Sequence, residues 1–575
     1  MDAHRPHPSV TGHRATAVLA LVFALIVGLA APSQADTYPR QAGIDAREYI
    51  FRISLLDDTD TIRGLATVEL YFKEAGVSEV FLDLSGHTGG GETGMTVDAV
   101  WIAGGSDEAA VTQPTATGAA LGSEARFSHT GDRLRIALPE APAVGDRLFV
   151  TVSYSGIPTT GLIIGPNKHG DRTFFSDNWP SKARNWLPTI DHIAEKALMQ
   201  MVVTAPGHYQ VISNGLLVEE TDVAGGLRRT HWKQSVPIVP WLYMVGVARF
   251  AVDHLGTHQG VPIQTWVYAQ DRDAGFYDFS YPTREALDFY SEWVGPYAYE
   301  KLANIQSNSV GGGMEAATAI LYGDDSVTGT RSVRWRNVII HEIAHQWFGN
   351  AVTEADWDDV WLSEGFATYF TSLFIEHAYG RDEFVTTMQR ARDDIMRFYE
   401  TRPEYRIVHD NLTDMVQVTT GMQYAKGSWT LHMLRHRVGT ETFWEGIRRY
   451  YARYYNQHAT TAQFREVMEE VSGENLEQFF QQWLYQGSAG LALDGVWSYE
   501  NGNVELSLSQ TQAGGTVFEM PITLEFVAAD GTTERAVIQM AETEHAYSLP
   551  VGFEPASLVV DPDTWLLATT TVSRR

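Results

Sequence analysis

The chain has 575 residues, with 42 Lys and Arg against 71 Asp and Glu, which gives a formal net charge of −29 and a pI near 5.0. This length exceeds what one hydrophobic core supports, so we expect several domains. The acidity excludes a nucleic-acid-binding surface, which needs clustered Lys and Arg. The lack of cysteine excludes disulfides and a lipid-modified cysteine.

The N-terminal segment has the pattern of a targeting sequence. Arg5 and Arg14 precede an apolar run at 15–31, and Ser33-Gln34-Ala35 follows. We predict a signal peptide at 1–35 and export to the periplasm or the medium of a bacterium. The alternative is an uncleaved membrane anchor, although the run is slightly short for a bilayer, which needs about 20 residues. After cleavage we expect no stable membrane span.

Residues 36–248 alternate short β-rich runs with turn residues. Examples are "GLATVELYF", "DRLRIALPEA" and "RLFVTVSYSG". Apolar residues at every second position, bounded by Gly, Pro or Asp, indicate half-buried strands. We therefore predict an N-terminal β domain over 36–248, with a surface loop at about 103–123.

The apolar period changes to that of helices from about residue 280. "PTREALDFYSEWVG", "EGFATYFTSLFIEHAYG" and "TFWEGIRRYYARYYNQ" are examples, and most such segments end near Gly. Strand-like runs return in 488–575, for example "NVELSLSQTQ" and "FEMPITLEFVAADG". We predict a second domain over 249–487, which contains these helices, and a C-terminal β-sandwich over 488–575.

One of the helical segments, "VIIHEIAHQWFGN", contains two histidines four residues apart. Positions four apart share one face of a helix, so His341 and His345 can direct two ring nitrogens at one metal ion. Five residues are a weak motif, but Glu364 follows His345 after eighteen residues, on the next apolar helix, and supplies a third ligand. The alternative is a helical hairpin with histidines in its core.

A metal held by three protein ligands keeps a fourth position open for water. Zinc lowers the pKa of such a water to about 7, so hydroxide becomes available near neutral pH. Glu342 lies between the two histidines, where it can take the proton of the water and pass it to a leaving amine. The alternative for Glu342 is a solvated residue on the surface of the helix.

Four motifs in this order resemble the zinc aminopeptidase family of gluzincins, which includes membrane alanyl aminopeptidase and the leukotriene-hydrolase-like enzymes. They are "GGGMEAAT", "HEIAHQWFGN", "WLSEGFATY" and "YAKGSW". The resemblance implies a multidomain α+β protein with a saddle-like N-terminal β domain, a thermolysin-like α/β catalytic domain and a C-terminal β-sandwich. Many relatives add a large C-terminal helical domain, which we do not expect here.

The resemblance also implies roles for further residues. Tyr424 would donate a hydrogen bond to the oxyanion that forms during attack on a peptide carbonyl. Gly312, Gly313 and Met314 would contact the substrate main chain, and Glu315 would bind its free α-amine. One Zn²⁺ per chain would be held by His341, His345 and Glu364. The structural alternatives are that Tyr424 is a core residue, that the glycines form an ordinary loop and that Glu315 faces the solvent.

The sequence departs from the family pattern at two places. Ala316 stands where the family usually has asparagine after the glutamate. A second acidic amine anchor, present in many relatives, would fall at Trp179, with Asp177 nearby. The second anchor is therefore not identified by the motif.

We expect a zinc-dependent aminopeptidase that hydrolyses the N-terminal bond of peptides through a zinc-activated water. A thermolysin-type endopeptidase is the alternative among hydrolases, and it would need no buried acid for a free amine, so Glu315 discriminates the two. A non-catalytic binding or scaffold protein is the alternative from another class, but such a protein would be expected to have lost ligands or the base. A lipid-epoxide hydrolase side activity stays open. The expected partners are peptides with a free N-terminus.

Overall fold

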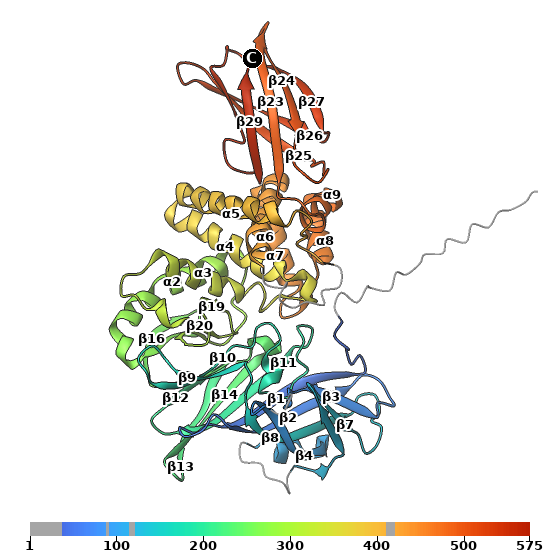
Figure 1. Cartoon of the computed structure of the whole chain (residues 1–575), viewed down its shortest axis with the longest axis vertical. Coiled ribbons are helices and arrows are strands. Elements are labelled where there is room, and N and C mark those ends of the chain that lie inside the picture. The colour runs from blue at the N-terminus through green and yellow to red at the C-terminus, as the bar shows by residue number, and fades with distance from the viewer. Residues whose placement is uncertain (1–36, 88–90, 114–120, 410–419) are drawn as a thin grey trace, which may run out of the picture. The chain divides into compact units, whose positions relative to one another are not determined.

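The computed structural model describes residues 37–87, 91–113, 121–409 and 420–575. The predicted signal peptide lies outside these residues. Among the described helices, none is both long enough and apolar enough to cross a membrane. The structure confirms the predicted fold class: a β-rich N-terminal part, an α/β part and C-terminal sheets (Figure 1).

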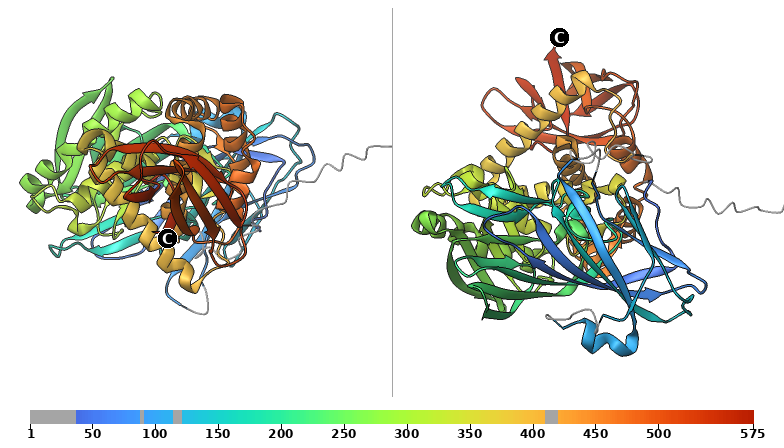
Figure 2. Two further views of the ribbon diagram at one scale, coloured as in Figure 1. Left: turned by 90° about the horizontal axis from the view of Figure 1, so that it is seen from above. Right: turned by 60° about the horizontal axis from the view of Figure 1, so that its bottom comes forward.

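The N-terminal part is built on an eight-stranded sheet in the order β13-β14-β11-β1-β2-β8-β4-β5, whose long strands are visible side by side in Figure 2, right. Alternate residues of β2 (Ile62–Phe72), such as Ala66, Val68 and Leu70, are buried, as the period of two predicts. All neighbouring pairs are antiparallel except β1 and β11, which are parallel. The other strands of this sheet are β1 (Ile44–Ser54), β4 (Gly94–Gly104), β5 (Ser123–Glu124), β8 (Arg147–Ile157), β11 (Ala197–Pro206), β13 (Leu216–Val223) and β14 (Leu227–Ile238).

Two smaller sheets complete this part, in the orders β3-β7-β6 and β12-β15-β10-β9. Their strands are β3 (Glu79–Asp83), β6 (Phe127–Thr130), β7 (Arg133–Ala137), β9 (Leu162–Pro166), β10 (Arg172–Ser176), β12 (Gln210–Ser213) and β15 (Val245–Ala248). The predicted loop at about 103–123 contains a helical turn, α1 (Glu108–Val111), whose Val111 is buried. The Val111 carbonyl accepts a 2.7 Å hydrogen bond from the Arg52 side chain. This contact holds part of the segment that we predicted, from its composition, to be a surface loop.

The α/β part contains a five-stranded sheet, β16-β17-β18-β20-β19, in agreement with the α/β catalytic domain that the resemblance implies. The apolar pattern of the sequence did not locate its strands. Strands β17, β18 and β20 are parallel, and β19 is a short antiparallel strand at the edge. Strands β18 and β20 are short and buried at every position, so their sequences show no alternation. The bounds are β16 (Phe250–His258), β17 (Val261–Tyr268), β18 (Leu302–Gln306), β19 (Gly313–Met314) and β20 (Ala319–Tyr322).

The helices follow the predicted segments, with two differences. Helix α2 begins ten residues before the predicted start, but its backbone leaves helical geometry at Tyr281 and Pro282, where the predicted segment starts. Helix α5 was not predicted, although its four buried residues lie on one helical face, because most of its sequence is polar or charged. The bounds are α2 (Arg272–Trp293), α3 (Val333–His345), α4 (Trp361–Tyr379), α5 (Arg381–Thr401), α6 (Gly421–Val438), α7 (Thr440–Arg453), α8 (Thr461–Ser472) and α9 (Glu477–Phe480).

The C-terminal strands form a four-stranded sheet, β27-β24-β23-β29, and a three-stranded sheet, β26-β25-β28. Strand β25 (Met520–Val527) buries Met520, Ile522, Leu524 and Phe526 on one face, as its alternating sequence predicts. The others are β23 (Leu491–Glu500), β24 (Asn503–Gln510), β26 (Thr533–Met540), β27 (Glu544–Pro550), β28 (Ser557–Val560) and β29 (Ala568–Arg574).

A buried histidine connects helix α6 to the C-terminal segment. The ring of His432 donates a 2.9 Å hydrogen bond from Nε2 to the Thr564 carbonyl and accepts at Nδ1 from the Tyr369 hydroxyl at 3.0 Å. Burial, with Arg381 and Arg435 also contributing, lowers the pKa of His432 to about 3. The folded protein therefore holds this imidazole neutral.

We expect the stability difference between the wild type and a His432→Gln variant to shrink as pH falls from 7 to 5. The unfolded histidine takes up a proton below its ordinary pKa of about 6.5, whereas the folded one does not until about pH 3. The stability that His432 contributes above pH 6.5 is thus lost as pH falls, at up to about 1.4 kcal/mol per pH unit. Urea unfolding of both proteins at several pH values measures this, and a difference independent of pH would contradict it.

Candidate metal centre

The two motif histidines lie on the last turns of helix α3. His341 and His345 are one turn apart on the same face, and their Nε2 atoms are 3.0 Å from each other. The Nδ1 atom of His345 lies 3.1 Å from the Phe348 carbonyl, which can only accept a hydrogen bond. Nδ1 therefore carries a hydrogen, which leaves Nε2 as the atom that can bind a metal ion.

The third predicted ligand, Glu364, lies in the first turn of helix α4, which packs against α3 (Figure 1). Its Oε2 atom is 3.1 Å from Nε2 of His345 and 3.4 Å from Nε2 of His341. The side chain of Glu364 is 5% exposed. Burial acts to raise its pKa, but His345 and His341 outweigh burial and hold the pKa at about 2. Glu364 is therefore a carboxylate.

These three atoms fit a tetrahedral metal ion. Ligand bonds of about 2.0–2.1 Å at tetrahedral angles separate the ligand atoms by roughly 3.3 Å, close to the 3.0, 3.1 and 3.4 Å edges of this triangle. Oε2 of Glu364 is buried and accepts no well-aligned hydrogen bond, so it is orphaned without a cation. Two imidazoles and one carboxylate form the donor set of a catalytic zinc site.

Sequence reasoning missed one residue of this centre, Ser363. Its hydroxyl lies 3.1 Å from Nδ1 of His345 and so joins the Phe348 carbonyl in fixing the ring. Ser363 precedes Glu364 in the sequence, and nothing in the sequence indicates that its side chain contacts His345 instead. Partners of this kind orient metal-bound histidines.

A close helix crossing brings Tyr424 to the centre. Helices α4 and α6 meet at Gly365 and Gly427, where a Cβ on either glycine would come within 2.9 Å of the other glycine's Cα. Side chains at these positions would force the helices apart. The crossing lets the Tyr424 hydroxyl donate a 2.7 Å hydrogen bond to Oε1 of Glu364. Burial and the Glu364 carboxylate raise the pKa of Tyr424 well above its usual value, so it stays a proton donor.

Two more carboxyl groups, Glu342 and Glu315, border the same centre. Together with His345 they place one donor atom each within 4.8 Å of one another. Each is 5% exposed, and Oε1 of Glu315 has no hydrogen-bond partner among the described residues. Burial raises the pKa of Glu342 well above its usual value, with Glu315 as the next cause. Burial and Glu364 raise the pKa of Glu315 to about 7, against the lowering effect of His345.

The glycine-rich motif runs along the edge of the five-stranded sheet. Gly313 and Met314 form β19, and the Gly312 carbonyl accepts a 2.9 Å hydrogen bond from the amide of Gly323. A Cβ at Gly313 would lie 2.1 Å from Oε1 of Glu342. A side chain at Gly313 would therefore displace the Glu342 carboxylate. Met314 is buried, at 4% exposure.

The structure gives no acidic side chain at the position of the second amine anchor. Trp179 packs edge-on against Trp241 and Trp357, with ring centroids 4.6 and 5.3 Å apart. The neighbouring Asp177 forms a 2.7 Å ion pair with Lys182. Asp177 is also among the groups that raise the pKa of Glu315, although it is the weakest named cause. Its charge is already compensated by Lys182.

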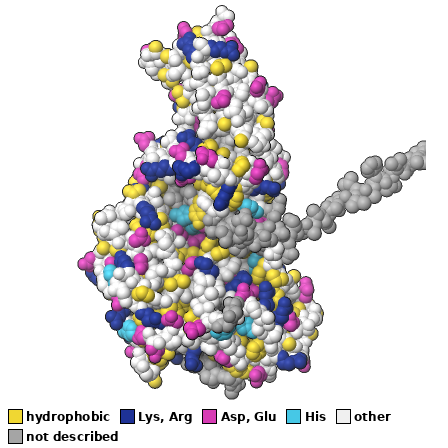
Figure 3. All heavy atoms as spheres, in the orientation of Figure 1, with side chains coloured by type: hydrophobic (Ala, Val, Ile, Leu, Met, Phe, Trp, Pro, Cys, Tyr) yellow, Lys and Arg dark blue, Asp and Glu magenta, His cyan; other side chains and the backbone are white. Residues whose placement is uncertain are grey.

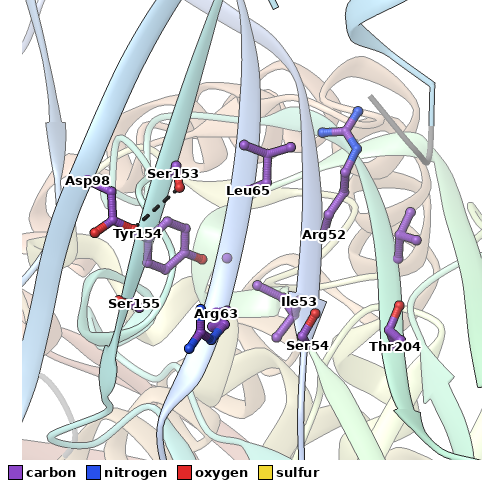
Figure 4. A pocket seen from close by; sticks show the side chains of 12 residues that line it. Arg52, Ile53, Ser54, Arg63, Leu65, Asp98, Ser153, Tyr154, Ser155 and Thr204 are labelled. Carbon is purple, nitrogen blue, oxygen red and sulfur yellow. Dashed lines mark hydrogen bonds between the residues drawn. The ribbon is translucent and has the colours of Figure 1, made fainter. Parts of the chain in front are cut away.

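A separate pocket of about 310 Å³ lies on the N-terminal sheet (Figure 4). Arg52, Arg63, Asp98 and several serine and threonine hydroxyls line it, and none of the predicted site residues does. On the face shown in Figure 3, acidic and basic side chains of the described residues are interspersed.

Comparisons with known proteins agree with this site. Residues 46–242 match the Peptidase M1 N-terminal domain, and residues 281–483 match the Peptidase family M1 domain, which contains all the candidate ligands. Human glutamyl aminopeptidase is 28% identical over 378 residues, covering 62% of this chain and 39% of that protein. Aminopeptidase M1 of Arabidopsis thaliana is 26% identical over 361 residues, covering 60% of this chain and 40% of that protein.

The chain thus spans about two fifths of the length of these relatives. Its fold resembles the crystal structure of an M1 zinc metallopeptidase from Deinococcus radiodurans, with a TM-score of 0.63 and 23% identity. That likeness covers 77% of this chain and 93% of the other. Two successive domains of one family therefore match in order, and the chain belongs to peptidase family M1.

Proposed function

We propose that this protein is a zinc-dependent aminopeptidase that removes N-terminal residues from peptides. The observation that carries the proposal is the triangle of His341, His345 and Glu364 with two buried carboxyl groups, Glu342 and Glu315, beside it. A bound zinc ion would supply Lewis acidity, which polarises a carbonyl and makes water a nucleophile near neutral pH. The names of the relatives, glutamyl aminopeptidase and aminopeptidase M1, support the same activity.

Glu342 is the proposed general base and acid. It follows the ligand His341 directly, and its carboxyl group shares a 4.8 Å cluster with Glu315 and His345. It takes the proton of the attacking water and gives it to the leaving amine.

Tyr424 is the proposed donor to the oxyanion. Its hydroxyl stands beside the ligands, where it donates to Glu364 Oε1 at 2.7 Å. The hydroxyl can turn from that oxygen to the negative oxygen that develops on the substrate carbonyl. Its stacking on His341, with centroids 5.9 Å apart, holds the ring in the site.

A Tyr424→Phe variant is expected to fold, to keep its metal and to lose kcat by about 10²–10³, the usual cost of one oxyanion donor. KM should change much less, because the hydrogen bond is made to charge that exists only in the transition state. Steady-state kinetics and metal analysis of wild type and variant measure this. An unchanged kcat would assign the role to another group.

The substrate would bind as an extended strand along β19. Within the described residues this strand pairs only with β20, so its outer edge is available to pair with the substrate main chain, apart from the Gly312 carbonyl, which already accepts from Gly323. The α-ammonium would pair with Glu315, whose buried Oε1 has no other partner. That pairing fixes the distance from the amine to the metal, so the first peptide bond is the one attacked.

The experiment that tests this function is a panel of fluorogenic aminoacyl substrates, assayed with and without a metal chelator, beside an N-acetylated internal peptide. Cleavage of free-amine substrates that stops with chelator and returns with Zn²⁺ is the expected result. Efficient internal cleavage of the acetylated peptide would favour an endopeptidase. No hydrolysis of either class by metal-loaded protein would favour a binding or scaffold role.

We further propose that the protein is exported, with cleavage after Ala35, and acts on peptides in the periplasm or outside the cell. The charged and apolar pattern of residues 1–35 supports this. Mass spectrometry of the protein from the expressing cell, after fractionation, measures its mature N-terminus. A cytoplasmic protein that retains residues 1–35 would overturn the proposal, and a membrane-bound one would indicate an uncleaved anchor.

A further inference from the structure

The side chain of Gln346 connects the metal-binding helix to the loop that carries Glu315. Gln346 follows the ligand His345 directly and is 0% exposed. Its Nε2 donates a 3.0 Å hydrogen bond to the Glu315 carbonyl, and its Oε1 accepts a 3.1 Å bond from the Thr318 amide. One amide group thus holds both ends of the segment 315–318.

The far end of this segment has a strained backbone. Thr318 has a φ of +66°, a region that β-branched residues rarely adopt. It is fully buried and held by further bonds: its hydroxyl accepts from the Gly215 amide at 2.7 Å, and its carbonyl accepts from the Ala303 amide at 2.9 Å. Such a conformation persists only where the surroundings impose it, and residues of this kind concentrate at functional sites.

A second side chain from the same motif supports the other end. Nδ2 of Asn350 donates a 2.7 Å hydrogen bond to the carbonyl of Glu315, and the Asn350 amide donates to the His345 carbonyl at 3.1 Å. The Glu315 carbonyl therefore accepts two hydrogen bonds from side chains that lie one and five residues after His345. Glu315 is fixed to the ligand-bearing segment rather than only to its own loop.

We propose that Gln346, assisted by Asn350, is the positioning residue that sets the place of the Glu315 carboxylate relative to the metal ligands. This inference rests on the proposed function and deepens it, because the distance from amine anchor to metal selects the first peptide bond. Gln346 itself touches neither substrate nor metal. It acts by holding the segment 315–318 against helix α3.

The consequence is a selective defect when Gln346 becomes methionine, which has a similar volume and neither hydrogen-bonding group. The ligands and Glu342 stay in place, so metal binding should persist. The Glu315 carboxylate is then no longer held in a fixed position. The contribution of the substrate α-amine to the binding affinity should therefore fall. If Gln346 had only a general structural role, its replacement would weaken the binding of inhibitors with and without an α-amine by the same factor.

Two inhibitors that differ only in the α-amine measure this. Leucine hydroxamate and 4-methylpentanohydroxamic acid share the metal-binding group and the side chain, so the ratio of their inhibition constants reports the contribution of the amine. For Gln346→Met we expect this ratio to fall at least about tenfold, the size of one charge-assisted hydrogen bond. The constant for the amine-free hydroxamate should stay within about threefold of wild type.

Gln482→Met is the matched control. Gln482 is also 0% exposed, and its amide makes the same pair of backbone hydrogen bonds, from Nε2 to the Glu519 carbonyl at 3.1 Å and from the Glu519 amide to Oε1 at 2.9 Å. It lies away from the metal centre, in the segment before the C-terminal sheets. We expect its inhibitor ratio to equal that of the wild type.

A wild-type ratio in Gln346→Met would overturn this inference alone. A wild-type protein that itself shows no preference for the amine would instead remove the amine anchor from the proposed function. If Gln346→Met does not fold or loses metal, Asn350→Ala decides, since it removes one donor to Glu315 and leaves the Thr318 bond intact. The ratio should then fall by a smaller factor, and an unchanged ratio would again refute the inference.

Discussion

Replacing Glu342 with glutamine is expected to lower kcat by about 10²–10⁴ while metal content stays at the wild-type level. The amide keeps the size and shape of the side chain but cannot accept the proton of the attacking water. The three proposed ligands are His341, His345 and Glu364. Glu342 supplies none of the ligand atoms, so the affinity for zinc should not depend on its charge. KM should change little, because the proton transfer belongs to the chemical step.

Glu354→Gln is the matched control for this variant. Glu354 is another buried glutamate, 1% exposed, on β21 (Thr353–Glu354), and burial likewise raises its pKa well above the usual value. Its replacement removes an acid of similar burial that has no proposed role in the reaction. A Glu342→Gln protein that retains a large share of kcat, with the control unaffected, would remove Glu342 from the mechanism.

A Glu315→Ala variant is expected to lose about 10–100-fold or more in kcat/KM on free-amine peptides, the cost of a charge-assisted hydrogen bond to a buried group. The wild type should cleave such peptides stepwise and N-acetylated ones scarcely at all, because acylation removes the charge that Glu315 binds. The variant should narrow the gap between the two substrates. Rates for both substrates on both proteins give this comparison.

Two outcomes would contradict the role of Glu315. One is efficient internal cleavage of an N-acetylated peptide by the wild type, which would identify an endopeptidase. The other is a variant that loses activity equally on both substrates, which would indicate a structural defect. Asp177 and Trp179 cannot replace the anchor in this expectation, since the first is paired with Lys182 and the second has no charge.

The metal ligands could be predicted from the sequence because their geometry is local. The helical period alone places His341 and His345 on one face, and the spacing to Glu364 needs only that the next helix packs against the first. The strands of the outer sheets were also predictable, because one face of β2 or β25 is buried and the other is not. For these helices and strands, the spacing of residues within one short segment is enough to predict which side chains share a face.

The rest depends on contacts between distant parts of the chain. The contact of Tyr424 with Glu364 exists because two glycines let α4 and α6 approach, which no local pattern reveals. Gln346 follows a ligand in sequence, yet its role comes from the strained turn at Thr318. Helix α5 was missed for a different reason. Phe384, Met388, Ile395 and Tyr399 form a buried stripe at helical spacing, but charged and polar residues fill most of the positions between them.

Zinc binding by His341, His345 and Glu364 is tested by the zinc content of the purified wild type and of a His345→Ala variant. Inductively coupled plasma mass spectrometry measures that content. His345 is the most buried of the ligands, with a side chain that is 1% exposed, and it forms two edges of the ligand triangle. We expect one zinc per chain in the wild type and almost none in the variant, with peptidase activity lost in parallel. A variant with the zinc content of the wild type would contradict the assignment of His345 as a ligand and place the metal elsewhere.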